Sequence, residues 1–70
     1  MDLDLATNLK NIAMDFYQGN IGSANSKYFN ELQKLETYEP FIKNAEKVLK
    51  LQENEDWVAI GDFFFYITET

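Results

Sequence analysis

The chain has 70 residues, contains no cysteine, histidine or arginine, and carries a formal charge of -6 because twelve Asp and Glu residues outnumber six lysines. These features argue against a disulfide-stabilised fold, a zinc site and direct binding to nucleic-acid phosphates. No apolar stretch is long enough to span a bilayer and the first residues carry no basic signal region, so we expect a cytoplasmic protein without membrane contact. A domain of this size buries only about 60% of its unfolded surface, so apolar packing or self-association must stabilise it.

Residues 4–18 carry the clearest helical pattern. One face holds apolar residues at helical spacing, namely Leu5, Leu9, Ile12 and Phe16, with Ala6, Ala13 and Tyr17 beside them. Polar side chains lie on the opposite arc. Gly19 suits the left-handed position that ends a helix, and Asn20 suits the start of the next one. The pattern predicts an amphipathic helix followed by a tight turn.

Two further apolar stripes follow. The stripe of the second predicted helix, 21–36, consists of Ile21, Ala24, Tyr28, Leu32 and Leu35, with Phe29 at its margin. The stripe of the third, which begins at Pro40, consists of Phe41, Ile42, Ala45, Val48 and Leu49. One long helix kinked at Pro40 is the alternative, but the two stripes of a straight rod would point about 100° apart. A break between Thr37 and Pro40 is the better interpretation, with Pro40 in the first turn of the third helix.

The C-terminal segment is apolar on two faces. Asn54, Glu55 and Asp56 supply a cap and first-turn acids for a fourth helix. Its first stripe consists of Trp57, Ile60, Phe64 and Ile67, with Phe63 at the edge, and its second consists of Val58, Gly61 and Phe65. A β-strand is the alternative because these residue types favour sheets, although no other segment offers a strand to pair with. We therefore predict a single all-α domain over 1–70, a small four-helix bundle whose last helix is central or lies at an interface.

A resemblance to known proteins agrees with this fold. The stretch LQENEDWVAIGDFFFYI, preceded by the apolar spacing from Phe16 to Leu32, resembles a family of small uncharacterised all-helical proteins of Firmicutes. The family pattern E-N-x-D-Y-V-x-x-x-D is matched by Glu53 to Val58 and then Asp62, with Trp57 in place of Tyr. The resemblance implies a bacterial helical bundle and carries no activity.

Two motifs have structural interpretations that we prefer to chemical ones. Gly19 to Ser23 precedes a helix, as phosphate-binding loops do, but it matches no P-loop or dinucleotide fingerprint, so we predict a plain turn. The acidic group Glu53, Glu55, Asp56 and Asp62 lacks the alternating oxygens and central glycine of a calcium loop, so we predict caps and a solvated face. No nucleophile, base or metal-ligand set is recognisable. We expect no enzyme activity, no catalytic residues, no metal and no cofactor.

Charge is concentrated near the end of the chain. Residues 1–26 sum to -2, residues 27–50 to +1 and residues 51–70 to -5. An apolar surface with an acidic rim favours a partner with a basic rim. The predicted interface consists of Trp57, Val58, Gly61, Asp62 and Phe65. We expect this interface to bind a second copy of the chain, forming a homodimer, or another protein whose apolar surface has a basic rim.

We therefore predict a self-associating, non-enzymatic interaction module that acts as an adaptor, chaperone-like or regulatory protein. The alternative is a small acidic inhibitor of the phage type, which imitates nucleic-acid phosphates against a basic protein surface. Such an inhibitor needs a wide acidic face. The lysines of residues 27–50 interrupt one, so the sequence favours the interaction module.

Overall fold

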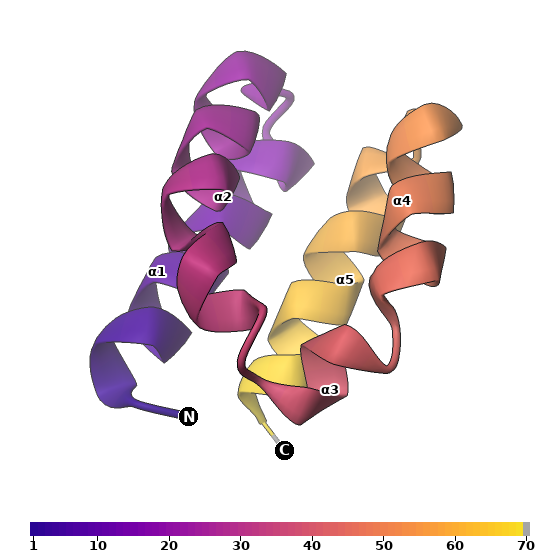
Figure 1. Ribbon diagram of the computed structural model, residues 1–70. Coiled ribbons are helices and arrows are strands. Elements are labelled where there is room, and N and C mark those ends of the chain that lie inside the picture. Colours follow the sequence, from indigo (N-terminus) through magenta and orange to yellow (C-terminus); the bar gives the residue numbers. More distant parts are fainter. Residues whose placement is uncertain (70) are drawn as a thin grey trace.

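A computed structural model describes residues 1–69, and the regular structure in that range is entirely helical (Figure 1). The helices are α1 (Leu3–Tyr17), α2 (Ile21–Leu35), α3 (Glu39–Ile42), α4 (Ala45–Glu53) and α5 (Trp57–Thr68). The prediction of an all-α fold is confirmed, and the strand alternative for the C-terminal segment is wrong. The predicted number of helices is also wrong, because the third predicted helix is two separate helices.

Both ends of α1 form as the sequence predicts, within one residue. The Asp2 side chain accepts a hydrogen bond from the Leu5 N–H over 2.7 Å and so caps the first turn. At the other end Gly19 has a φ of +80°, which a side chain disfavours, and the Asn20 N–H donates to the Asp15 carbonyl oxygen at 2.9 Å. This turn brings α2 back along α1.

The break after α2 lies where it was predicted. Helix α2 ends at Leu35, Tyr38 is extended with φ -103° and ψ 113°, and Pro40 lies in the first turn of α3. The predicted third helix carries one stripe from Phe41 to Leu49. It is interrupted after Ile42 instead, and α4 begins at Ala45.

Asn44 causes the interruption. In a continuous helix its N–H would donate to the Pro40 carbonyl oxygen, but it donates to that of Phe41 at 3.0 Å. The Asn44 side-chain amide takes over the Pro40 oxygen at 2.8 Å, and the Asn44 carbonyl accepts the first hydrogen bond of α4 from Val48. A short amide that competes with the backbone in this way favours a helix end. Helix α3 is therefore a single turn.

The interruption also changes which residues of this region are buried. Phe41 and Val48 lie in the core, as predicted. Ile42, Ala45 and Leu49 are exposed, so the predicted stripe is wrong for these three residues. The reason is that α3 and α4 no longer share one helical phase, and only one narrow face of each meets the core.

A single core joins the helices, and α5 lies at its centre. Helix α5 packs against both α1 and α4, and α1 packs in addition against α2 (Figure 1). The predicted stripe of α1 is confirmed, since Leu5, Leu9, Ile12 and Phe16 are all buried. Helix α5 contributes Ile60, Gly61, Phe63, Phe64 and Ile67 to the buried set. Over residues 1–69, no helix combines the length and apolarity needed to cross a membrane.

Candidate functional site

The predicted interface on α5 is largely covered by the chain's own first helix. Gly61 is buried, and a Cβ placed on it would lie 2.7 Å from Cε1 of Tyr17. The missing side chain therefore admits the Tyr17 ring from α1. The surface at Gly61 is therefore occupied by a residue of the same chain.

The aromatic residues of the predicted interface also contact α1. The ring of Phe65 stacks on that of Tyr17 with centroids 6.0 Å apart and planes 6° apart, and Trp57 stacks on Phe16 at 5.7 Å and 8°. Both Phe65 and Trp57 are half-buried as a result. A bundle in which each helix turns one stripe inward would leave the second stripe of α5 uncovered. Here α5 is central instead, and α1 and α4 cover two sides of it.

The two remaining residues of the predicted interface are exposed. The Asp62 carboxylate accepts a hydrogen bond of 2.5 Å from the Tyr17 hydroxyl, and the Val58 side chain is 57% exposed. Partial burial, followed by the hydrogen bond to Asp62 and its negative charge, raises the pKa of Tyr17 to about 12. The hydroxyl therefore stays protonated near neutral pH and ties α1 to α5. Val58 alone offers little apolar area for a partner.

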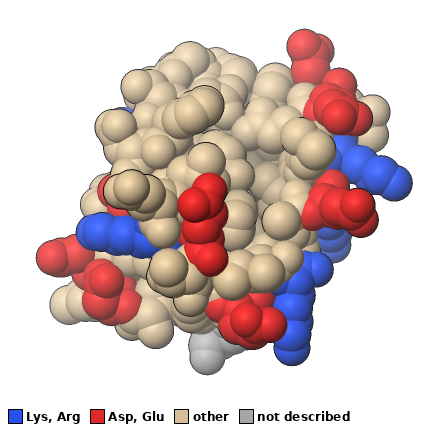
Figure 2. All heavy atoms as spheres, in the orientation of Figure 1, with Lys and Arg blue, Asp and Glu red and all other residues tan. Residues whose placement is uncertain are grey.

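A larger apolar surface lies between α2 and α4. The two helices flank a groove of about 630 Å³, and they are not among the closely packed helix pairs. Figure 2 shows that most charged side chains of this face lie toward its edges, although one acidic side chain stands near the middle. The groove is lined by Asn25, Tyr28, Phe29, Leu32 and Glu36 from the α2 side and by Phe41, Ala45, Val48, Leu49 and Gln52 from the α3–α4 side.

The floor and rims of this groove differ in burial. Phe41 and Val48 are buried at the floor, where the Tyr28 ring lies 6.3 Å from that of Phe41. On the rims, the side chain of Phe29 is 75% exposed and that of Leu49 is 59% exposed. The groove is therefore an extension of the core toward solvent, with a large apolar residue on each side.

Several polar side chains also line the groove. The Gln52 side-chain amide donates to the Asn25 side-chain oxygen at 2.9 Å and links the two helices. Burial, and secondarily the nearby negative charge of Glu36, raises the pKa of Tyr28 above its usual value. Tyr28 is therefore neutral near physiological pH. Between these groups the lining is mainly apolar.

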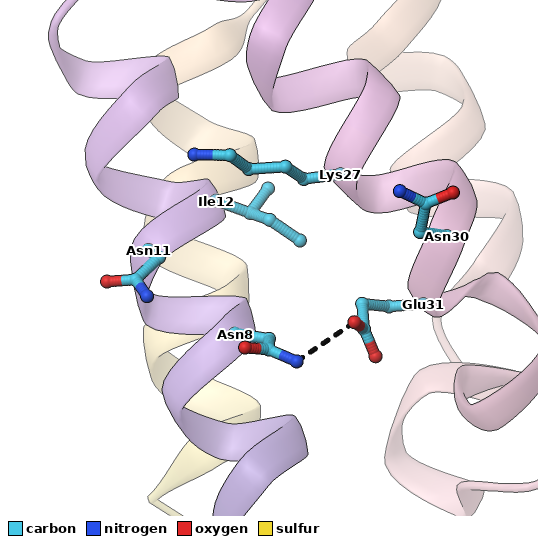
Figure 3. Close-up of a pocket in the computed structure, with 6 residues that line it drawn as sticks. All are labelled: Asn8, Asn11, Ile12, Lys27, Asn30 and Glu31. Atoms are coloured by element: carbon cyan, nitrogen blue, oxygen red, sulfur yellow. Dashed lines mark hydrogen bonds between the residues drawn. The ribbon is translucent and has the colours of Figure 1, made fainter.

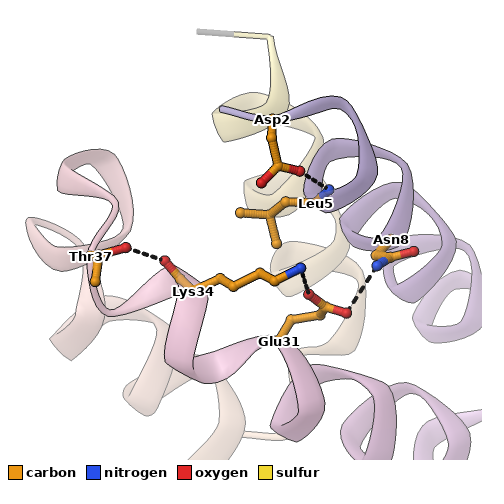
Figure 4. Close-up of polar contacts among 6 residues, drawn as sticks. All are labelled: Asp2, Leu5, Asn8, Glu31, Lys34 and Thr37. Carbon is orange, nitrogen blue, oxygen red and sulfur yellow. Dashed lines mark hydrogen bonds and ion pairs between the residues drawn. The ribbon is translucent and has the colours of Figure 1, made fainter.

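A smaller pocket of about 230 Å³ lies between α1 and α2 and is polar (Figure 3). Across it the Asn8 side-chain amide donates to Oε1 of Glu31 at 2.9 Å (Figure 4). On α2 itself, Nζ of Lys34 lies 4.0 Å from Oε2 of Glu31. Lys27, which also lines the pocket, instead contacts Asp15 at 2.7 Å, an interaction that lowers the pKa of the Asp15 carboxyl. The Asn8–Glu31 and Lys27–Asp15 contacts hold α1 against α2, whereas the Lys34–Glu31 pair lies within α2. They include no nucleophile and no base directed at a common point.

Of the acidic residues before α5, Asp56 caps the helix as predicted, but the first turn of α5 holds no acid, so the prediction of first-turn acids is wrong. The Asp56 side chain accepts a long hydrogen bond of 3.4 Å from the Ala59 N–H at the start of the helix. Glu55 adopts a left-handed backbone with φ 55° in the turn between α4 and α5. Within residues 1–69, no three acidic side chains lie close enough together to hold a metal ion.

Sequence reasoning missed the groove because its two rim residues do not form one pattern. Phe29 stood at the margin of one stripe, and Leu49 was assigned to the core. The available signal was the position of Phe29, about 100° away from the buried line of α2 on the helical wheel. Comparison with protein-family models, with curated proteins and with solved structures found no match.

Proposed function

We propose that this protein is a non-enzymatic interaction module that binds another protein in the groove between α2 and α4. The observation that supports the proposal is the pair of exposed apolar side chains, Phe29 and Leu49, on opposite rims of a groove with a buried floor. Exposed apolar surface in a continuous concave patch is typical of protein-binding sites. An adaptor, a chaperone-like protein and a regulatory subunit each need only such a surface.

The proposed site replaces the one predicted on α5. Most of that surface is already occupied by α1, whereas the groove has no covering helix within the described residues. The acidic-inhibitor alternative receives no comparable support. In Figure 2 lysines stand among the acidic residues on the visible face, so that face does not present a continuous array of negative charge.

The experiment compares two double variants as bait in affinity capture from a lysate of the source cells. The groove variant combines Phe29→Ser with Leu49→Gln, and the control combines Leu3→Gln with Val58→Ser. The control residues are 81% and 57% exposed, similar to the groove pair, and they lie outside the groove. The exchanged residue types have similar helix propensities.

We expect proteins retained by the wild type and by the control to be lost from the groove variant. The reason is that two apolar contacts at the centre of a docking surface carry much of its binding free energy. Equal retention of the same proteins by the groove variant would contradict the proposed site.

A further inference from the structure

The charges around the groove have one predominant sign. Glu36 is the only charged residue among those that line it. On α4, the positions three before and four after Leu49 are Glu46 and Glu53, both exposed, and this spacing places them beside Leu49 on the outer side of the rim. Lys50 lies about 100° around the helix from Leu49, farther from it than either glutamate. A ligand that touches Leu49 therefore meets carboxylates at its edge.

The shape and length of the groove also suit the binding of one helix. From Asn25 on α2 to Glu36 directly after it, the lining residues follow helical spacing, and on α4 they do so from Ala45 to Gln52. These rows are about 17 Å and 11 Å long at 1.5 Å per residue, which corresponds to two or three turns of a bound helix. Ridges of this kind, on two helices that do not pack closely together, accommodate the ridges of a third.

We infer that the groove binds an amphipathic helix of another protein, with an apolar row that fits between Phe29 and Leu49 and with Lys or Arg residues beside that row. This inference rests on the proposed function and adds the chemistry of the partner. Charge favours a foreign helix over a second copy, because a second copy carries a formal charge of -6 as well. Its groove would bring the same carboxylates against these.

The test uses two labelled synthetic peptides, each of about four helical turns, with the same row of Leu residues. One has Lys beside the row and the other has Glu. Binding is measured by fluorescence anisotropy at low and high salt. We expect the Lys peptide to bind roughly tenfold more tightly than the Glu peptide at low salt, since three exposed carboxylates each contribute a modest attraction. The ratio should fall as salt screens these charges.

Two variants separate charge from apolar contact. The combination of Glu36→Gln, Glu46→Gln and Glu53→Gln should remove the preference for the Lys peptide while weak binding through the apolar row persists. The combination of Phe29→Ser and Leu49→Gln should weaken binding of both peptides, whereas the control with Leu3→Gln and Val58→Ser should bind as the wild type does.

Three results would overturn the inference. The first is equal affinity for the two peptides, and the second is binding that the groove variant leaves unchanged. The third is a dimer, observed by light scattering of the protein alone, that dissociates when Phe29 and Leu49 are replaced, because a second copy would then be the occupant. Loss of captured cellular proteins from the groove variant would still support the proposed function in the first case. The two ideas therefore fail separately.

Discussion

The two sides of this molecule use aromatic and aliphatic residues in opposite ways. Between α1 and α5, Gly61 permits close approach, Tyr17 stacks on Phe65, and a hydrogen bond to Asp62 holds the ring in place. Between α2 and α4 no such approach occurs, and Phe29 and Leu49 remain in solvent.

The difference shows that the burial of a residue depends on which helix lies opposite it. The segment with three consecutive phenylalanines is the most conspicuous part of the sequence, and it forms the centre of the core. Single apolar residues such as Phe29 look unremarkable in the sequence, yet they form the largest open apolar surface that we identify. We therefore expect the exposed rims of the α2–α4 groove to contribute less to stability than the α1–α5 side, and the α2–α4 side is the candidate for binding.

The largest difference in stability between the two sides is expected when one phenylalanine on each side is truncated to alanine. Phe64 is fully buried, and the centroid of its ring lies 5.5 Å from that of Tyr28 and 6.4 Å from that of Phe16. Phe64→Ala should lower the free energy of unfolding by about 3–5 kcal/mol, because it leaves a cavity in the core. Phe29→Ala should change it by about 0.5 kcal/mol or less.

Urea denaturation, followed by circular dichroism, measures both changes. A loss of about 3–5 kcal/mol is comparable with the whole stability of a domain this small, so Phe64→Ala is expected to be largely unfolded. Similar losses for the two variants would show that Phe29 belongs to the core, and the distinction between the two sides would be wrong.

A smaller effect is expected at Gly61, where the approach of Tyr17 is tested directly. Gly61→Ala gains about 1 kcal/mol from helix propensity but forces the Tyr17 ring to move, which typically costs about 1–3 kcal/mol. We expect a net loss of about 1 kcal/mol. In a Tyr17→Ala background the same substitution should stabilise the protein, because no ring stands in the way.

A double-mutant cycle of these two positions, measured by urea denaturation, reports the sign in each background. A change of sign would confirm that the ring and the glycine are coupled. If Gly61→Ala has the same effect in both backgrounds, the close contact between Gly61 and Tyr17 does not contribute to stability.

How much the sequence predicts follows from how local each feature is. The three- and four-residue spacings from Leu5 to Phe16, the left-handed Gly19 and the cap at Asp56 depend on neighbours within a few positions, and all three were predicted correctly. The break before Pro40 is local in the same sense, because Pro fixes its own backbone and restricts that of the preceding residue.

The features that the sequence did not predict depend on residues far apart in the chain or on a choice between two hydrogen bonds. The Asn44 side chain competes with its own backbone for the Pro40 oxygen, and either outcome is compatible with the pattern. The covering of Gly61 by Tyr17 requires knowing that α1 lies on that side of α5. To predict the groove, one would need to know that, among the described residues, no helix lies between Phe29 and Leu49.

A third prediction tests the α1–α5 side through pH. In the folded protein the pKa of Tyr17 is raised from 10.0 to about 12, so between these values the folded state binds more protons than the unfolded state. The stabilising contribution of this group is complete below pH 10 and is lost as the pH rises toward 12. Because the ring is partly exposed, we expect an effect smaller than that at Gly61.

Urea denaturation below pH 10 and again between pH 10 and 12 measures this loss. Tyr17→Phe should remove part of the alkaline loss, because it removes the titrating hydroxyl. Tyr66→Phe is the matched control, since Tyr66 is exposed on the same helix as Asp62, whereas the Asp62 carboxylate accepts its hydrogen bond from Tyr17. An identical alkaline loss in the wild type and in Tyr17→Phe would exclude Tyr17 as its source.

The smallest expected change in stability belongs to the α2–α4 side. The variant that combines Phe29→Ser with Leu49→Gln should differ from the wild type by about 0.5 kcal/mol or less, because both side chains are mostly in solvent and the exchanged residues have similar helix propensities. Urea denaturation measures this difference. A loss of more than about 2 kcal/mol would mean that the rim residues complete the core. A near-zero change together with lost binding is the combination expected of two large apolar residues that contribute to recognition and not to folding.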